Sequence, residues 1–148
     1  MKPPEIRELD DDDHPAANAL FAQLNPDVPP EILAQRFTAI LAGHPHYRIF
    51  GAFEDGRLAA VAGVWIATKI WCGRYLEIDN LVVDAARRSS GLGSALLRYL
   101  EALAIAEDCN IAVLDSYTSN HASHRLYHRH GYEIRGFHFI KPLAPLDR

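Results

Sequence analysis

The sequence predicts a mixed α/β fold in which helices flank one central sheet. Two short apolar runs, 81–83 and 111–114, are typical of buried strands, and a helical pattern lies between them. Strand, helix and strand in this order predict a parallel pair joined by a crossover. Two longer apolar stretches upstream flank the turn 54–57 and predict an antiparallel pair. With 148 residues and no linker, repeat or low-complexity segment, the chain is expected to form one domain, 1–148.

The N-terminal part is predicted to hold a strand over 6–9 and two helices. The acidic run 10–13 is interpreted as a solvated turn that ends in a helix N-cap at Asp13, with Pro15 in the first helical turn. This helix runs to about Gln23. A second helix is expected over 31–42, with Gly43 as its C-cap.

The rest of the chain alternates strands and helices. Strands are expected over 47–53, 58–68 and 74–83, and a glycine-opened helix begins at Leu92. Its apolar residues share one face that can pack on a sheet: Leu92, Ala95, Leu96, Tyr99, Leu100 and Leu103. A buried strand is expected over 110–115, then a helix over 120–130 closed by Gly131, and finally strands around 132–140.

Composition narrows the class of protein. The N-terminus has no apolar signal segment, and the longest apolar run, 58–67, is too short to cross a bilayer. Cys72 and Cys109 do not form a spaced pair of the zinc or redox type, so a reducing cytoplasm is the expected location. The net charge of −4 argues against a nucleic-acid partner and fits a small cationic one.

The strand, turn and helix over 81–97 have the geometry of an anion site. A helix start presents unpaired N–H groups and partial positive charge, which favours phosphate oxygens. Gly91 and Gly93 leave these amides accessible, and Arg88 adds a charged donor. The Walker pattern is absent, and the dinucleotide fingerprint is excluded because Leu96 stands where its third glycine belongs.

Two motifs together resemble the GNAT N-acetyltransferase superfamily. The pattern Arg88-x-x-Gly91-x-Gly93 is similar to its acetyl-coenzyme A loop, and residues 120–132 are similar to its motif Asn-x-x-Ala-x-x-x-Tyr-x-x-x-Gly-Phe. Ser123 replaces the alanine and Tyr132 the phenylalanine. The resemblance covers about 76–133 and implies a mixed, mostly antiparallel sheet with a splayed parallel pair that admits acetyl-coenzyme A.

The resemblance implies a set of residues that bind the coenzyme. The end of the fourth strand would bind the pantetheine arm and polarise the thioester, and the loop would bind the pyrophosphate. Asn120 would be both a helix N-cap and a coenzyme contact. The full set is Leu81, Val82, Val83, Arg88, Ser89, Ser90, Gly91, Leu92, Gly93, Ser94, Asn120 and Tyr127.

The chemistry of acetyl transfer needs a base and an acid. Glu77 and Asp79 are two residues apart on one strand and therefore share a face. Glu77 stands where GNAT histone acetyltransferases place their glutamate base, and Asp79 or an ordered water is the alternative base. Without a catalytic role, Glu77 would be an exposed strand carboxylate or a partner for a nearby arginine. Tyr127 stands at the general-acid position of the family, although a tyrosine on a helix that faces a sheet is also a common packing residue.

The sequence therefore predicts an acetyl-coenzyme A dependent N-acetyltransferase that transfers acetyl directly to a primary amine, either a small molecule or a lysine side chain. Glu77, Asp79 and Asp115 favour a cationic acceptor. A noncatalytic acyl-coenzyme A sensor is the alternative function. No metal site is expected, because no carboxylate or cysteine completes a set with His121, His124 and His128; these histidines, and His138, are assigned to the surface or the acceptor side.

A homodimer is expected from the behaviour of small GNAT proteins and from the aromatic residues near predicted strand ends. These residues are Trp65, Trp71 and the segment 137–140. Aromatic side chains at such positions also occur in protein cores, which is the alternative interpretation.

Overall fold

The computed structural model of the protein describes residues 2–88 and 90–146. Its sheet has five strands in the order β1-β2-β3-β4-β5. All neighbouring strands are antiparallel except β4 and β5, which are parallel. This mixed sheet confirms the predicted fold class. The strands are β1 (Glu5–Glu8), β2 (Tyr47–Glu54), β3 (Arg57–Lys69), β4 (Gly73–Val83) and β5 (Ile111–Leu114).

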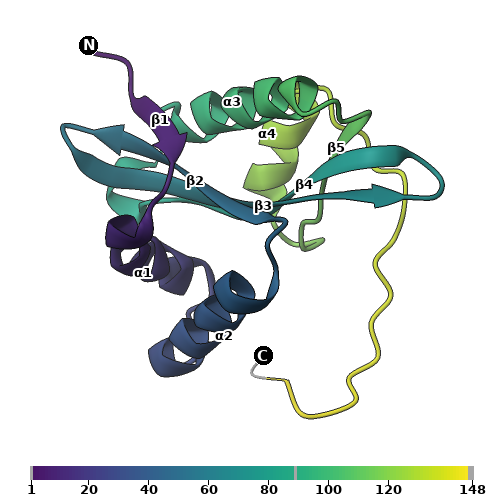
Figure 1. Ribbon diagram of the computed structural model, residues 1–148, viewed down its shortest axis with the longest axis horizontal. Coiled ribbons are helices and arrows are strands. Elements are labelled where there is room, and N and C mark those ends of the chain that lie inside the picture. The colour runs from purple at the N-terminus through teal and green to yellow at the C-terminus, as the bar shows by residue number, and fades with distance from the viewer. Residues whose placement is uncertain (1, 89, 147–148) are drawn as a thin grey trace.

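Two pairs of helices cover the two faces of the sheet (Figure 1). The helices α1 (His14–Leu24) and α2 (Pro30–Gly43) lie on one face. The helices α3 (Leu92–Ala106) and α4 (His121–Arg129) lie on the other. Short 3-10 turns, η1 (Asp11–Asp13) and η2 (Ala85–Arg87), precede α1 and α3.

The larger core lies between the sheet and α3. Leu96, Leu97 and Leu100 are fully buried there against Phe50 and Leu76 of the sheet. Each such leucine contributes about 1.5 to 3 kcal/mol of hydrophobic stabilisation. The predicted apolar face of this helix is confirmed, except that Tyr99 lies at its exposed margin, 36% exposed.

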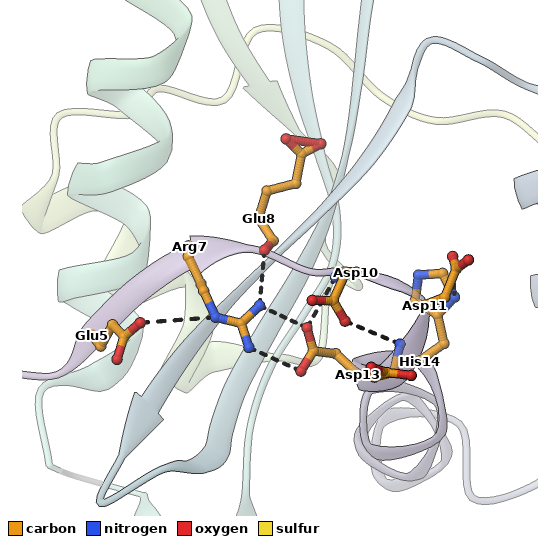
Figure 2. A network of polar contacts seen from close by, with 8 residues as sticks. Glu5, Arg7, Glu8, Asp10, Asp11, Asp13 and His14 are labelled. Carbon is orange, nitrogen blue, oxygen red and sulfur yellow. Dashed lines mark hydrogen bonds and ion pairs between the residues drawn. The ribbon is translucent and has the colours of Figure 1, made fainter.

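The last residue of the acidic run, Asp13, is held by an arginine of β1 (Figure 2). Asp13 holds the predicted N-cap position of α1, but its side chain makes no capping hydrogen bond to this helix. Instead its carboxylate accepts two hydrogen bonds from Arg7, at 2.7 and 3.0 Å, and one from the Asp10 amide at 2.9 Å. The Arg7 hydrogen bonds and the Asp10 amide lower the pKa of Asp13 to about 2. The Asp13 carboxylate therefore pairs with Arg7 and does not bond to the first amides of α1.

Two other helix and strand predictions are corrected. Gly43 is the last residue of α2 and not its cap, because the C-cap position is occupied by His44. The strand β5 is half-buried and not fully buried, because it forms the edge of the sheet among the described residues. Gly131, by contrast, follows α4 with a φ of 86°, as expected of a helix-terminating glycine.

The strands predicted around 132–140 are absent from the described structure, in which 133–146 has no regular secondary structure. This segment runs away from the sheet (Figure 1). Its apolar residues do not alternate, since Ile134 and Ile140 fall on even positions and Phe137 and Phe139 on odd ones. A strand with such a pattern cannot bury all of them on one face, and Gly136 weakens it further.

Within the described part of the chain, no helix combines the length and the apolar character that crossing a membrane requires.

Candidate active site

The parallel pair β4 and β5 separates part of the way along β4. The two strands pair from Tyr75 with Ile111 to Ile78 with Leu114, whereas β4 continues to Val83. The stretch 79–83 therefore has no ladder partner on the β5 side among the described residues. A bulge between Val61 and Gly63 of β3 lies opposite this stretch, where β4 carries an extra residue. The result is a notch in the sheet beside residues 79–83.

The backbone of the notch is fixed by side chains on both faces. Asn80 adopts the left-handed conformation, with a φ of 56°, which re-aims the strand after Asp79. Val82 is then buried in the core beside α1, while Leu81 and Val83 pack against the core beside α3. Anchored in this way, the residues of 81–83 leave their backbone groups at a fixed, open edge.

On the α1 side of the sheet, two carboxylates lie beside one indole. Trp65 of β3 is the register partner of Glu77. Its Nε1–H donates a hydrogen bond of 3.0 Å to Oδ2 of Asp79. Glu77 and Asp79 thus neighbour the same tryptophan, as their spacing on one strand predicts.

The pKa of the Glu77 carboxyl is raised above its ordinary value. Burial is the main cause, and the negative charges of Asp115 and Asp79 add to it, while Lys69 and His138 act in the opposite direction. His138 reaches this group from the C-terminal segment, with Nδ1 at 3.3 Å from Oδ2 of Asp115. A carboxylate with a raised pKa is a stronger proton acceptor than an ordinary glutamate.

Trp65 is surrounded by three further rings, which the sequence did not single out as site residues. Its ring centroid is 5.3 Å from those of His44 and His46 and 4.6 Å from that of Tyr47. We call Trp65, His44, His46 and Tyr47 the aromatic cluster. Because the cluster depends on the register of β2, β3 and the α2 end, only an exact strand alignment could have located it. Trp65 is half-buried in this cluster, which favours the alternative that its ring belongs to the core.

On the α3 side, the glycine loop leads into an open helix start. Gly91 is the N-cap of α3 with a φ of 83°, and no described side chain caps the helix there. Arg88, Ser90 and Gly91 are exposed, and Ser89 lies outside the described residues. The first amides of α3 are thus accessible to an anion, and the residues fit a pyrophosphate group.

Gly93 marks the place where three elements meet. A Cβ on Gly93 would lie 3.6 Å from side-chain atoms of both Leu126 of α4 and Val83 of β4. Leu92, next to it, is 2% exposed and anchors the helix start in the core. The glycine loop, the end of β4 and α4 therefore converge at the notch.

The helix α4 places Asn120 and Tyr127 on this side of the sheet. Oδ1 of Asn120 accepts a hydrogen bond of 3.3 Å from the Ser123 amide, so the predicted N-cap is confirmed. Tyr127 packs against the core, with its ring centroid 6.2 Å from that of Tyr132. Burial raises the pKa of Tyr127, and a hydrogen bond with Ser123 opposes this in part. The phenol therefore carries its proton at neutral pH.

The histidines of α4 make separate local contacts. His124 Nε2 is 2.9 Å from the Tyr117 carbonyl oxygen, and His128 Nδ1 is 3.2 Å from that of Tyr132. His130, just beyond the helix, contacts Ser94 and Glu101 of α3. Among the residues described, no three or more histidine, cysteine, aspartate or glutamate side chains are grouped so as to hold a metal ion.

Comparison with known proteins identifies the family to which the chain belongs. Residues 4–132 match the family model described as "Acetyltransferase (GNAT) family". The uncharacterised N-acetyltransferase YhdJ of Bacillus subtilis is 28% identical over 125 residues, which are 84% of this chain and 87% of YhdJ. Glucosamine 6-phosphate N-acetyltransferase 1 of rice is 34% identical over 103 residues, 65% of this chain and 62% of that protein.

A solved structure shows the same fold at lower sequence identity. The aminoglycoside N-acetyltransferase AAC(6')-Iy in complex with CoA has a TM-score of 0.81 at 19% identity, with 95% of each chain covered. The family match, which ends close to the last element of the sheet and its helices, covers the notch with both of its sides. The protein is therefore an acetyltransferase of the GNAT family.

Proposed function

We propose that the protein transfers the acetyl group of acetyl-coenzyme A directly to a primary amine whose own charge is positive. The observation that carries this proposal is the notch beside 79–83, which has an uncapped helix start on one side of the sheet and the carboxylates of Glu77 and Asp79 on the other. Anion and cation sites on opposite faces of one opening suit a ternary complex of coenzyme and amine.

The coenzyme side of the proposal uses the residues at the helix start. The amides of Gly91, Leu92, Gly93 and Ser94 would bind the pyrophosphate, with Arg88, Ser89 and Ser90 beside them. Backbone groups of Leu81, Val82 and Val83 would bind the pantetheine arm and stabilise the oxyanion, and Asn120 would add a contact from α4. AAC(6')-Iy, which shares the fold, was solved in complex with CoA, and this supports coenzyme A as the ligand.

Glu77 is proposed as the base. It would take the proton from the acceptor ammonium, after which the nitrogen can form its bond to the thioester carbon. The raised pKa of Glu77 supports this role, since the carboxylate holds a proton more readily than an ordinary one. Asp79 is held by Trp65 and is the reserve candidate, directly or through an ordered water.

Tyr127 is proposed as the acid. As the carbon–sulfur bond breaks, its phenol would give a proton to the departing thiolate, so that the products are the acetylated amine and free coenzyme A. Its protonated state at neutral pH, maintained by burial, supports the role.

The acceptor is proposed to be a polycationic amine or a lysine side chain, and not a sugar phosphate. The rice relative is named for glucosamine 6-phosphate, whose phosphate needs basic partners. Here the groups that act electrostatically on Glu77 include the carboxylates of Asp79 and Asp115, against Lys69 and His138. This balance, with the aromatic cluster beside it, favours ammonium groups.

The test is a thiol-release assay with acetyl-coenzyme A and a panel of amines. We expect turnover with polyamines, aminoglycosides or lysine peptides and little with glucosamine 6-phosphate. Coenzyme A binding without turnover on any amine would instead support the alternative, a noncatalytic acyl-coenzyme A sensor.

We also propose that the GNAT domain acts as a homodimer in the cytoplasm. Both cysteines are free thiols, which suits a reducing compartment. The segment 133–146 supports the dimer, because its large apolar side chains are exposed: Ile134, Phe137, Phe139, Ile140, Leu143 and Leu146.

A further inference from the structure

Three polar side chains form a chain from the coenzyme loop to the middle of α3. Oγ of Ser94, in the first turn of α3, is 3.1 Å from Nε2 of His130. On the other side of the imidazole ring, Nδ1 of His130 is 3.5 Å from Oε1 of Glu101. The His130 side chain is 11% exposed, so water competes little for its two nitrogens. His130 thus joins α4 to α3 through one hydroxyl and one carboxylate.

The carboxylate of Glu101 beside Nδ1 sets a preferred direction for the hydrogen bond between Ser94 and His130. A carboxylate only accepts, so Glu101 favours the hydrogen of the neutral imidazole on Nδ1. Nε2 is then an acceptor, and the Ser94 hydroxyl must donate to it. In this state Ser94 presents only lone pairs to the outside, and these repel phosphate oxygens.

Protonation of His130 reverses the direction. The imidazolium carries hydrogen on both nitrogens, so Nε2–H donates to Ser94 and the hydroxyl hydrogen becomes free. Ser94 can then donate to an anion at the start of α3, and a positive charge stands behind it. The proton on His130 and an anion at the loop therefore favour each other.

We propose that His130 is a positioning residue that makes coenzyme binding proton-linked, by switching the Ser94 hydroxyl from acceptor to donor toward the coenzyme phosphates. The proposal rests on the proposed function in one respect, the binding of coenzyme A at this loop. Linkage is reciprocal. If coenzyme A binds the protonated form of the protein more tightly, the protein therefore takes up protons as the coenzyme binds.

The titratable groups around His130 come from α3 and from the segment after α4. Glu101 of α3 is the ionised group that faces the ring. Tyr132 lies near Glu101 in the segment after α4, and its phenol keeps its proton because burial, with Glu101 and Tyr127, raises its pKa. His130 is itself the C-cap residue of α4.

The test is calorimetric titration with coenzyme A at pH 6 and pH 8.5, in pairs of buffers that differ in ionisation enthalpy. For the natural protein we expect proton uptake on binding and a Kd about tenfold higher at pH 8.5, as for the loss of one hydrogen bond to a charged group. In His130→Gln both the uptake and the pH dependence should fall by most of their value. The phosphates of the coenzyme titrate equally with both proteins. The difference between the natural protein and His130→Gln therefore reports on His130 alone.

Two further variants make the test specific. Ser94→Ala, a change to a strong helix former, should weaken binding about tenfold at pH 6 and hardly at pH 8.5, where the hydroxyl already donates to His130. His128→Gln alters a histidine of the same helix that contacts a different carbonyl, and it should behave as the natural protein does. Circular dichroism verifies that each variant is folded.

The possible failures are separable. If the natural protein binds coenzyme A but His130→Gln keeps its pH dependence and proton uptake, or Ser94→Ala weakens binding equally at both pH values, the role of His130 is refuted and the coenzyme site stands. If the folded natural protein does not bind coenzyme A at either pH, the proposed function fails, and the proton linkage with it.

Discussion

At the scale of single residues, Glu77 gives opposite expectations for activity and for stability. Glu77→Gln keeps the shape of the side chain and removes the proton acceptor, so kcat should fall, most strongly at low pH, where the amine is almost all ammonium. A loss that is the same at every pH would point to acceptor binding and not to proton transfer.

The stability of the same variant follows from the sign of the pKa shift. Because the pKa of Glu77 is raised in the folded protein, the folded state binds more protons than the unfolded state between the two pKa values. Stability is therefore lost as pH rises through the folded pKa. Glu77→Gln should have a higher Tm than the natural protein at pH 7, with a smaller difference at pH 4, as thermal melts at the two pH values would show.

Tyr127 and Tyr132 are a matched pair of neighbouring, half-buried tyrosines. Tyr127→Phe removes the proposed acid and should lower kcat by about one to four powers of ten at saturating amine and coenzyme, with little change in coenzyme affinity. The Tyr132 hydroxyl is buried with no hydrogen-bond partner among the described residues, so Tyr132→Phe should leave kcat unchanged and cost no stability. A burst experiment should accompany the assay, because slow product release hides the loss of an acid.

At the scale of elements, the start of α3 can be tested with two glycines of equal strain. Gly91 and Gly56 have φ values of 83° and 75°, and a Cβ on either would meet no atom within 4 Å. Gly91→Ala and Gly56→Ala should therefore lose similar stability, about 1 to 2 kcal/mol. Only Gly91→Ala should also raise the Kd for coenzyme A, measured by calorimetry on folded protein; equal affinities in the two variants would place the phosphates elsewhere.

The middle of β3 depends on a glycine for a different reason. A Cβ on Gly63 would collide with the Tyr47 ring and hydroxyl, so Gly63→Ala must displace Tyr47 from Trp65. We expect a loss of about 1 to 3 kcal/mol in urea unfolding, together with a higher KM for the amine. Gly43→Ala is the control: no atom lies within 4 Å of its Cβ, and alanine suits the end of α2, so stability should be equal or higher.

Local features of the fold could be predicted from the sequence, whereas contacts between distant elements could not. The elements from β1 to α4 follow from periodicity, turn residues and the family motifs, which are all local signals. The aromatic cluster and the Ser94–His130–Glu101 chain were missed because each joins residues from different elements. The ion pair of Asp13 was missed for the same reason, since its partner Arg7 lies on β1, whereas the N-cap position of Asp13 was predicted correctly. The prediction of strands around 132–140 was wrong, and the apolar residues of this segment do not alternate as those of a strand would.

At the scale of the whole molecule, the exposed C-terminal segment should govern assembly. Phe137 and Phe139 are 83% and 91% exposed, and the hairpin tip adds Trp71 at 73%. Light scattering is expected to give a dimer at micromolar concentration, and the double variant Phe137→Ser, Phe139→Ser should shift it to monomer without lowering the Tm of the monomeric fold. A natural protein that stays monomeric at high micromolar concentration would refute the dimer.

The carboxylates beside Trp65 have a consequence for the end of the catalytic cycle. Acetylation turns an ammonium group into a neutral amide, so the reaction itself erases the charge by which Glu77 and Asp79 would attract the acceptor. On the proposed mechanism the acetylated nitrogen no longer attracts these carboxylates, so the product would be held less strongly than the substrate. Added salt should accordingly raise the KM for the amine while leaving inhibition by the acetylated product weak and almost unchanged.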